Sequence, residues 1–339
     1  GDCIKADITV SFIALKPAHA ISPAVDYCGR IITADIGIYD EAVNNIDTKL
    51  YSIDKDDIGR LFKKRRKDSH KGDFGTSLAI CGARGMSGAA VISASAAVRC
   101  GAGIVKCAVP EGVCGIVAGY MPEYMVYPMP QTESGGIDVS AYDKIMELVD
   151  KSDAVLIGCG LGSDPQTVNL VKSLLKKINK PVVLDADGIN AIAGDISILK
   201  KMSAPAVLTP HPGEMARLCG VTSKEIQSNR FKYAREFAQE NNVILLLKGA
   251  NTIVACGDTA YINLTGSPSM ATAGSGDMLS GMILSFITQG MGMVDAVRAA
   301  VCMHGLAGET AEKKYSQRFV TPSDMINELA ELFSEFENS

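Results

Sequence analysis

The spacing of apolar and polar positions separates strands from helices along most of the chain. From residue 72 onward, short apolar runs rich in β-branched residues alternate with longer stretches in which apolar residues recur every three or four positions. The clearest helical stretches are Val168–Ile178 and Arg230–Gln239. The predicted strands are Ser77–Cys81, Gly103–Val109, Ala154–Gly158, Val182–Asp185, Ala206–Thr209, Val243–Lys248 and Thr252–Ala255. This alternation predicts an α/β fold with a mainly parallel central sheet covered by helices on both faces.

The first 71 residues have a different character. Ile8–Phe12 and Arg30–Ile36 are rich in β-branched residues and are joined by a loop with two prolines. Two such strands are too few for a domain, so we expect a short β-rich appendage over residues 1–42. Residues 43–69 are polar and charged and predict a linker with a short helix. Its basic run, Lys63–Lys67, fits a solvated joint better than a phosphate contact.

Charge and composition exclude several classes of function. The 339 residues contain 33 Lys and Arg against 38 Asp and Glu, so no basic excess exists to neutralise a polynucleotide, and we expect no nucleic-acid partner. No apolar stretch reaches the roughly 18–20 residues of a membrane span, and no secretory signal is predicted at the start of the chain. The 10 cysteines include no Cys-x-x-Cys pair, which favours reduced thiols in a cytoplasmic protein over disulfides or zinc.

The strongest candidate for chemistry is the segment Ala271–Asp277, which precedes a predicted amphipathic helix. Gly274 and Gly276 let the backbone approach a ligand closely. The unpaired amides of the first helical turn favour an anion, above all a phosphate. Asp277 beside that anion is placed to act as a base towards a hydroxyl group. The alternative, in which Asp277 only caps the helix, fits this segment equally well.

A second candidate, Lys248–Thr252, follows the fully apolar strand that starts at Val243. Lys248 can reach phosphate oxygens, and Asn251 and Thr252 can bond a ribose or a phosphate. Taken alone, however, this segment fits an exposed β-hairpin turn better than a nucleotide site.

A third candidate is Leu208–Met215, in which two prolines fix a loop after a buried strand. His211 is held between the prolines, so it can orient a polar ligand or shuttle a proton. Glu214 can bind Mg²⁺ through water. The alternative is a rigid helix entrance with Glu214 in the first turn, and we favour the functional interpretation because ligands bind at the carboxyl ends of strands.

Three further segments at the carboxyl ends of predicted strands are Gly-rich or acidic, namely Gly82–Ala90, Ile157–Gly162 and Leu184–Asn190. Each signal is weak alone. Together they make a cleft for a phosphate-bearing ligand plausible.

In this order, the motifs resemble the ADP/ATP-dependent NAD(P)H-hydrate dehydratase family of the ribokinase-like superfamily. The resemblance covers about residues 70–335 and depends most on the motifs at 209–214, 248–252 and 274–277. Further matching segments are His70–Gly75, Met86–Ala90, Gly158–Gly162, Leu184–Asn190 and Ala271–Gly281.

The resemblance implies repair of hydrated NADH and NADPH. ADP or ATP phosphorylates the ring hydroxyl, phosphate then leaves, and Asp277 is the catalytic base that takes the hydroxyl proton. Mg²⁺ is the expected metal, with Glu214 near it. The implied nucleotide-binding residues are Lys248, Gly249, Ala250, Asn251, Thr252, Gly274, Ser275 and Gly276. The implied hydrate-binding residues are Ala89, Gly160, His211 and Asp277. Apolar helices rich in Gly and Ala leave room for self-association, and we expect a homo-oligomer, a tetramer.

Residues 1–42 resemble something else, the tail of an NAD(P)H-hydrate epimerase domain. The matching segments are Lys5–Phe12, Lys16–Pro17 and Gly29–Ile38. We therefore expect an epimerase remnant over 1–42, a linker over 43–69 and the dehydratase domain over 70–339.

The sequence departs from the dehydratase pattern at two positions. Cys159 stands where the family usually has Pro, and Ser275 where Thr or Gln is common. Two other functions stay open. One is a ribokinase-like kinase of a small alcohol, and the other is a nucleotide sensor without catalysis, against which the position of Asp277 argues.

Overall fold

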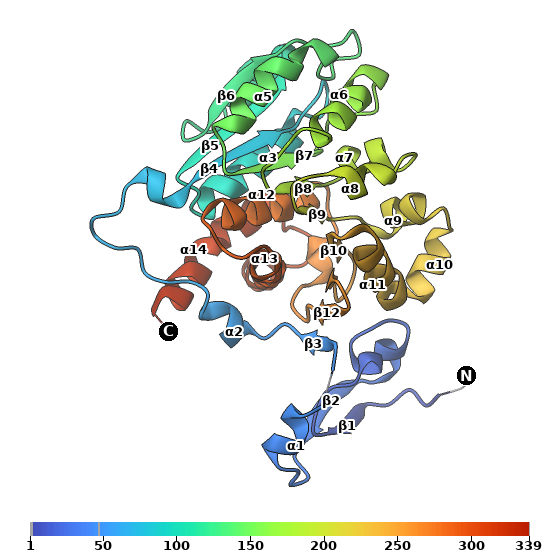
Figure 1. Ribbon diagram of the computed structural model, residues 1–339. Coiled ribbons are helices and arrows are strands. Elements are labelled where there is room, and N and C mark those ends of the chain that lie inside the picture. The colour runs from blue at the N-terminus through green and yellow to red at the C-terminus, as the bar shows by residue number, and fades with distance from the viewer. Residues whose placement is uncertain (1–2, 47, 339) are drawn as a thin grey trace.

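The computed structural model describes residues 3–46 and 48–338 (Figure 1). Ten of its strands form one sheet in the order β3-β12-β11-β10-β9-β8-β7-β4-β5-β6. The pairs β10–β11 and β11–β12 are antiparallel and the other pairs are parallel. The strands are β3 (Leu50–Ser52), β4 (Thr76–Ile80), β5 (Ile104–Pro110), β6 (Met125–Met129), β7 (Ala154–Ile157), β8 (Val182–Leu184), β9 (Ala206–Leu208), β10 (Ile244–Leu247), β11 (Ile253–Cys256) and β12 (Thr259–Ile262). The predicted α/β architecture is confirmed.

Helices cover both faces of the sheet because its strands are apolar on both sides. In β7, Ala154 and Leu156 join one buried cluster, whereas Val155 and Ile157 join the other. The first cluster contains residues of α2 (Lys55–Gly59), α3 (Ser87–Arg99), α4 (Glu111–Ala118), α12 (Ser275–Thr288), α13 (Met293–Tyr315) and α14 (Pro322–Asn338). The second contains residues of α5 (Tyr142–Asp150), α6 (Pro165–Leu175), α7 (Asp187–Ile192), α8 (Ser197–Lys201), α9 (Pro212–Cys219), α10 (Ser223–Ser228) and α11 (Arg230–Asn241). No helix in the described part of the chain is long and apolar enough to cross a membrane.

Three strands of the sheet were not predicted, and each lies at or near a sheet edge. β6 is an edge strand that contains Pro128, a residue that the interior of a sheet excludes because it lacks an amide hydrogen. β12 follows β11 after a short turn in which Gly257 has φ 55°, and β3 is three residues long. Short edge strands carry little apolar periodicity, so the sequence pattern does not reveal them.

The expected linker contains a short helix, α2, as predicted, and is packed against the domain over part of its length, whereas its basic run, Lys63–Lys67, is exposed. β3 pairs in parallel with β12, and Ile53 and Ile58 are buried in the first cluster. The Arg65 guanidinium lies 3.6 Å from the centre of the Phe74 ring and donates to the carbonyl of Gly101. These apolar and cationic side chains find partners far along the chain, which local composition does not show.

The appendage contains two parallel strands, β1 (Ile8–Phe12) and β2 (Arg30–Ala34), and the short helix α1 (Asp40–Asn44) follows it. The second predicted strand ends two positions before Ile36. Ala20, in the loop between the strands, is buried, and its carbonyl accepts a hydrogen bond from Asn251 Nδ2. The appendage therefore contacts one of the loops predicted to bind nucleotide.

Candidate active site

The carboxyl ends of β7, β8, β9 and β10 meet at one edge because these parallel strands are neighbours in the sheet. Helix α12 lies on one face of the sheet in contact with β4, β7 and β8, and its amino-terminal half lies beside Asp185 and Lys248, which follow β8 and β10. A cavity of about 790 Å³ opens beside it, lined by residues 248–252, by residues between Asn263 and Gly276, and by His211 and His304. This volume is typical of a small-molecule site. Most of the residues predicted to bind nucleotide are thus brought together, and Gly274 lies just outside the lining.

The amino end of α12 has the geometry of an anion site. Its N-cap is Gly274, with φ 92°, and no side chain caps the helix. This positive φ favours glycine, and a Cβ atom at Gly274 would also lie 2.6 Å from Ile92 Cδ1. The Ser275 amide donates to the Thr272 carbonyl at 3.4 Å, whereas the amides of Gly276 and Asp277 have no backbone acceptor in the described residues. They are left for a ligand, and the helix dipole favours negative charge. Asp277 does not cap this helix, which removes the structural alternative for this residue.

Next to the amino end of α12, an ion pair connects the ends of two strands. Asp185 follows β8 and is 1% exposed, and its Oδ1 lies 2.7 Å from Lys248 Nζ, after β10. Asp185 Oδ2 accepts a hydrogen bond of 2.8 Å from Ser280 on α12. Burial would lower the pKa of Lys248, but the carboxylates of Asp185 and Glu214 outweigh it and raise that pKa. Lys248 is therefore a fixed cation at the inner end of the cavity.

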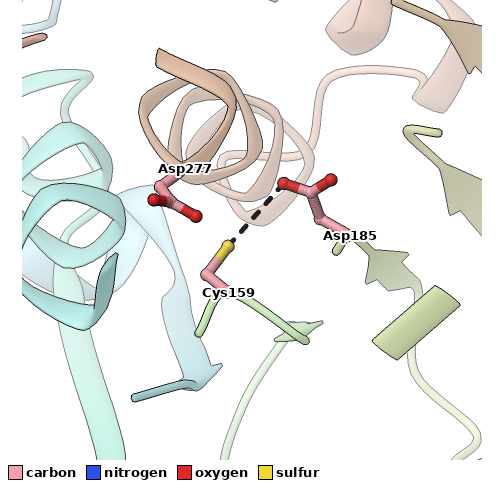
Figure 2. A group of neighbouring side chains, drawn as sticks. All are labelled: Cys159, Asp185 and Asp277. Carbon is pink, nitrogen blue, oxygen red and sulfur yellow. Dashed lines mark hydrogen bonds between the residues drawn. The ribbon is translucent and has the colours of Figure 1, made fainter. Parts of the chain in front are cut away.

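The catalytic candidate Asp277 lies next to Cys159 and Asp185 (Figure 2). A sulfur or oxygen atom from each of the three lies within 4.8 Å of the others. Burial first, and then the charge of Asp185, raises the pKa of Asp277 to about 6. A carboxylate with this pKa is still ionised at neutral pH and is more basic than an ordinary aspartate, as a general base requires.

These three residues do not form a plausible magnesium cage. A hydrogen bond with Cys81 and burial both raise the pKa of the Cys159 thiol well above its ordinary value, so the sulfur keeps its proton. Both Asp185 oxygens already have partners in Lys248 and Ser280. Mg²⁺ prefers oxygen ligands, which leaves the thiol as a weak donor between two carboxylates.

The loop 248–252 differs from the exposed hairpin turn that the sequence alone favours. β10 and β11 do form a hairpin, but Lys248 is partly buried and paired. Asn251 Nδ2 donates to Ala20, and Thr252 Oγ1 donates to the carbonyl of Gly249 at 3.0 Å. These two side chains hold the loop, and the amides of residues 249–251 donate to no backbone acceptor in the described residues.

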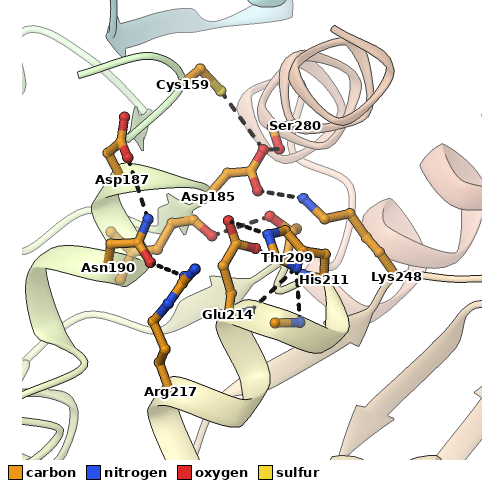
Figure 3. A network of polar contacts seen from close by, with 12 residues as sticks. Cys159, Asp185, Asp187, Asn190, Thr209, His211, Glu214, Arg217, Lys248 and Ser280 are labelled. Carbon is orange, nitrogen blue, oxygen red and sulfur yellow. Dashed lines mark hydrogen bonds and ion pairs between the residues drawn. The ribbon is translucent and has the colours of Figure 1, made fainter. Parts of the chain in front are cut away.

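His211 and Glu214 form the start of α9 (Figure 3). His211 Nδ1 accepts hydrogen bonds from the amides of Gly213 and Glu214, and Glu214 Oε2 accepts one of 2.8 Å from the His211 amide. The rigid helix entrance is therefore present, and yet half of the His211 side chain stays exposed on the cavity. Glu214 is 4% exposed, and its second oxygen lies 3.4 Å from His211 Nε2.

Of the four predicted hydrate residues, only His211 lines the cavity, and Ala89, Gly160 and Asp277 lie outside its lining. Gly160 has φ 64°, and a Cβ there would come within 2.8 Å of Ala89 Cβ, so Ala89 and Gly160 are neighbours. Asp187 holds the Gly-rich turn by accepting a hydrogen bond of 2.8 Å from the Gly162 amide. The turn after β7, which contains Cys159, is thereby fixed beside Asp277.

Sequence analysis missed two residues of this site and undervalued a third. The sequence shows Asp185 only as one of two acids at the end of a strand. Ser280 follows Asp277 by about one helical turn, so Ser280 and Asp277 lie on the same side of α12. His304, on α13, lies 3.2 Å from Ser275 Oγ through Nε2, and burial lowers its pKa to about 4. A neutral imidazole thus lies against the amino end of α12. No local sequence motif indicates this contact.

The family model for NAD(P)H-hydrate dehydratases matches residues 77–331. The chain belongs to this family. A bifunctional NAD(P)H-hydrate repair enzyme of Moorella thermoacetica is 40% identical over 328 residues, which are 96% of this chain. The chain spans 62% of the length of that relative.

Solved structures agree with this dehydratase assignment. An ADP/ATP-dependent NAD(P)H-hydrate dehydratase of Bacillus subtilis, co-crystallised with ATP and Mg²⁺, is 28% identical with a TM-score of 0.73 and covers 85% of this chain and 99% of its own. A ribokinase-like protein of Enterococcus faecalis, 23% identical, has a TM-score of 0.74 over 87% of this chain and 99% of its own, which shows the shared fold. The ribokinase-like fold expected from the motifs is confirmed.

The raised pKa of Asp277 predicts a cost in stability at neutral pH. The pKa is 3.8 for an ordinary Asp and about 6 in the fold, so the folded protein binds this proton more tightly than the unfolded chain does. The free energy of unfolding therefore falls as pH rises from about 4 to 6. Asp277→Asn should therefore stabilise the dehydratase domain by about 1–3 kcal/mol at about pH 7.5 and by less at about pH 4.5. Urea unfolding at both pH values measures this difference.

The matched control for that experiment is Glu147→Gln, because Glu147 is an exposed acid on α5. It should change the free energy of unfolding little at either pH. An Asp277→Asn protein that is less stable than wild type at about pH 7.5 would contradict the electrostatic account.

Proposed function

We propose that this dehydratase domain converts hydrated NADH and NADPH back to NADH and NADPH with ADP or ATP as phosphoryl donor. One observation carries the proposal: a carboxylate with a pKa of about 6, Asp277, lies in the first turn of a helix whose amino end is uncapped and borders a cavity. This arrangement supports proton removal from a hydroxyl beside a bound phosphate.

In the proposed reaction, the ring hydroxyl oxygen of the hydrate attacks the terminal phosphorus of the nucleotide, and Asp277 takes the hydroxyl proton. The bond between phosphorus and the leaving nucleotide oxygen breaks. The phosphorylated hydrate then loses phosphate and a proton from the adjacent ring carbon, which restores the double bond. Phosphate leaves far more readily than hydroxide, and this is the reason for consuming a nucleotide.

The residues proposed to hold the nucleotide are Lys248, Gly249, Ala250, Asn251, Thr252, Gly274, Ser275 and Gly276. Lys248 contributes a fixed positive charge, and a Cβ atom at Gly276 would lie 3.2 Å from its Nζ, so cation and helix amides are adjacent. Asn251 and Thr252 contribute through their backbone, since their side chains hold the loop. The B. subtilis relative was co-crystallised with ATP and Mg²⁺, which supports a nucleotide as ligand of this fold.

The residues proposed to contact the hydrate are Ala89, Gly160, His211 and Asp277. The half-exposed ring of His211 on the cavity supports its role. Ala89 and Gly160 lie against each other beside Cys159, which supports theirs.

Glu214 fits a magnesium ion held through water. One of its oxygens is bound to the His211 amide, so the carboxylate cannot offer both oxygens to a metal. Mg²⁺ keeps several waters and takes most other ligands from phosphates. When bound, the ion would neutralise phosphate charge, while Glu214 orients its water shell.

Replacing the base should abolish turnover while leaving nucleotide binding in place. We expect Asp277→Asn to lower kcat by about 10²–10⁴-fold, because the hydroxyl loses its proton acceptor. The near-ultraviolet absorbance of NADH formed from its hydrate and ADP measures the rate, and ADP binding by calorimetry is the control for an intact site. Turnover within a few-fold of wild type would remove Asp277 from the mechanism.

The same assay separates the two alternatives. A ribokinase-like kinase of a small alcohol would release a stable phosphoester rather than NADH. A nucleotide sensor would bind ADP and turn nothing over.

We also propose that residues 1–42 are an epimerase remnant, 43–69 a partly packed linker and 70–339 the dehydratase domain. Supporting this, β1 exposes Ile8, Val10 and Phe12, which share one face of a two-stranded parallel sheet. Parallel sheets are normally buried on both faces, so these strands look like the edge of a larger sheet.

A remnant of two strands should not epimerise the hydrate. The purified 339-residue chain is expected to leave the R and S forms of NADH hydrate unexchanged, whereas a full-length bifunctional relative serves as the positive control. Chromatographic separation of the two epimers over time is the measurement, and exchange by this chain above the spontaneous rate would refute the assignment.

The homo-oligomer, a tetramer, stays a prediction. Sedimentation equilibrium should give about four times the chain mass of 35.8 kDa, and a monomer would contradict it.

A further inference from the structure

A buried arginine lies directly beneath the loop that lines the cavity. Arg230 is the first residue of α11 and is 3% exposed. Its Nη1 donates to the carbonyl of Ala250 at 2.5 Å, and its Nη2 donates to the carbonyl of Leu247 at 3.2 Å. The guanidinium therefore connects the end of β10 to the middle of the loop 248–252.

The charge of this arginine is not neutralised within the protein. No carboxylate in the described ranges, 3–46 and 48–338, forms an ion pair with it, and its Nε is buried without a hydrogen-bond partner. Burial lowers the pKa of Arg230, yet a guanidinium keeps its proton in proteins. A buried cation without a counter-ion is costly, and an anion bound nearby would relieve that cost.

The backbone of the loop 248–252 packs against the Arg230 guanidinium on one side and lines the cavity on the other. Gly249 and Asn251 have φ 144° and 53°, and a Cβ at Gly249 would lie 2.9 Å from Arg230 Nη2, so the guanidinium packs directly against the backbone. In a trans peptide the carbonyl and amide point in opposite directions. Because Arg230 draws the Ala250 carbonyl inward, the Asn251 amide points away from it, towards the cavity. The amides of residues 249–251 donate to no backbone acceptor in the described residues.

We propose that Arg230 is a positioning residue for the nucleotide phosphates. By holding the Ala250 carbonyl, it orients the Asn251 amide towards a phosphate oxygen, and it adds a positive charge behind the loop. The inference rests on the proposed nucleotide role of the cavity and extends it to a residue that does not line the cavity.

The test compares three variants of the 339-residue chain. Arg230→Met removes charge and donors, and Arg230→Lys keeps the charge but lacks the planar fork. Lys232→Met is the matched control, because it removes one positive charge from the exposed side of the same helix. Calorimetry gives the Kd for ADP, and steady-state kinetics give the KM for NADH hydrate at saturating ADP.

Arg230→Met should weaken ADP binding about 10- to 100-fold, the usual range for hydrogen bonds to charged groups. Arg230→Lys should weaken it about 3- to 10-fold, and Lys232→Met should leave it unchanged. The KM for the hydrate should stay within about two-fold of wild type, because only the nucleotide contacts change. If Arg230→Met does not fold, the Arg230→Lys values decide the question alone.

Two results would overturn this role for Arg230. One is an unchanged Kd for ADP in both Arg230 variants. The other is a parallel rise of the ADP Kd and the hydrate KM, which would make the arginine a general support of the fold. Absence of ADP binding by the wild-type chain would instead overturn the proposed function itself, and this inference with it.

Discussion

The ion pair between Asp185 and Lys248 organises the chemistry of this domain. It joins the carboxyl ends of β8 and β10 at 2.7 Å, and Ser280 ties it to α12. A buried ion pair repays its desolvation only when its remaining hydrogen-bond positions are filled, and here Ser280 and the Cys159 thiol fill those of Asp185. The pair therefore fixes a cation for phosphate on one side and a carboxylate next to Asp277 on the other.

The two halves of this pair act in opposite ways on their neighbours. Lys248 lies against Gly276, where a ligand's negative charge is expected, and Asp185 helps to raise the pKa of Asp277 to about 6. A base and an anion site must be close together for transfer to a hydroxyl, although anions and carboxylates repel each other. Lys248 moderates that conflict, because its charge lies beside Gly276 and also acts to lower the pKa of Asp277.

The central fold was predictable because the strands that build it are short, apolar and β-branched, and burial on both faces leaves no other interpretation of that pattern. The candidate site was only partly predictable. The loop after β10, which starts at Lys248, and the start of α12 at Asp277 carry glycines and charges that local chemistry explains. The partner of Lys248 is 63 residues away, however, so whether that lysine is exposed or paired depends on strand order rather than on any local signal. Asn251 presents the same difficulty, since the group it bonds, Ala20, belongs to the appendage.

The features that sequence patterns could not show have a common physical origin: they are costs to folding that are concentrated around the cavity. Asp277 has a raised pKa, Arg230 has an unpaired Nε, and Asn251 adopts a left-handed backbone conformation. Each costs stability at a single site, and the two large apolar clusters on either face of the sheet offset that cost. Local rules of sequence interpretation assume that every residue favours the folded state, so they fail where binding and proton transfer require groups that do not. The contacts of Arg230 and Asn251, which the sequence does not reveal, therefore lie at the same place as the motifs at 248 and 277, beside the cavity at the amino end of α12.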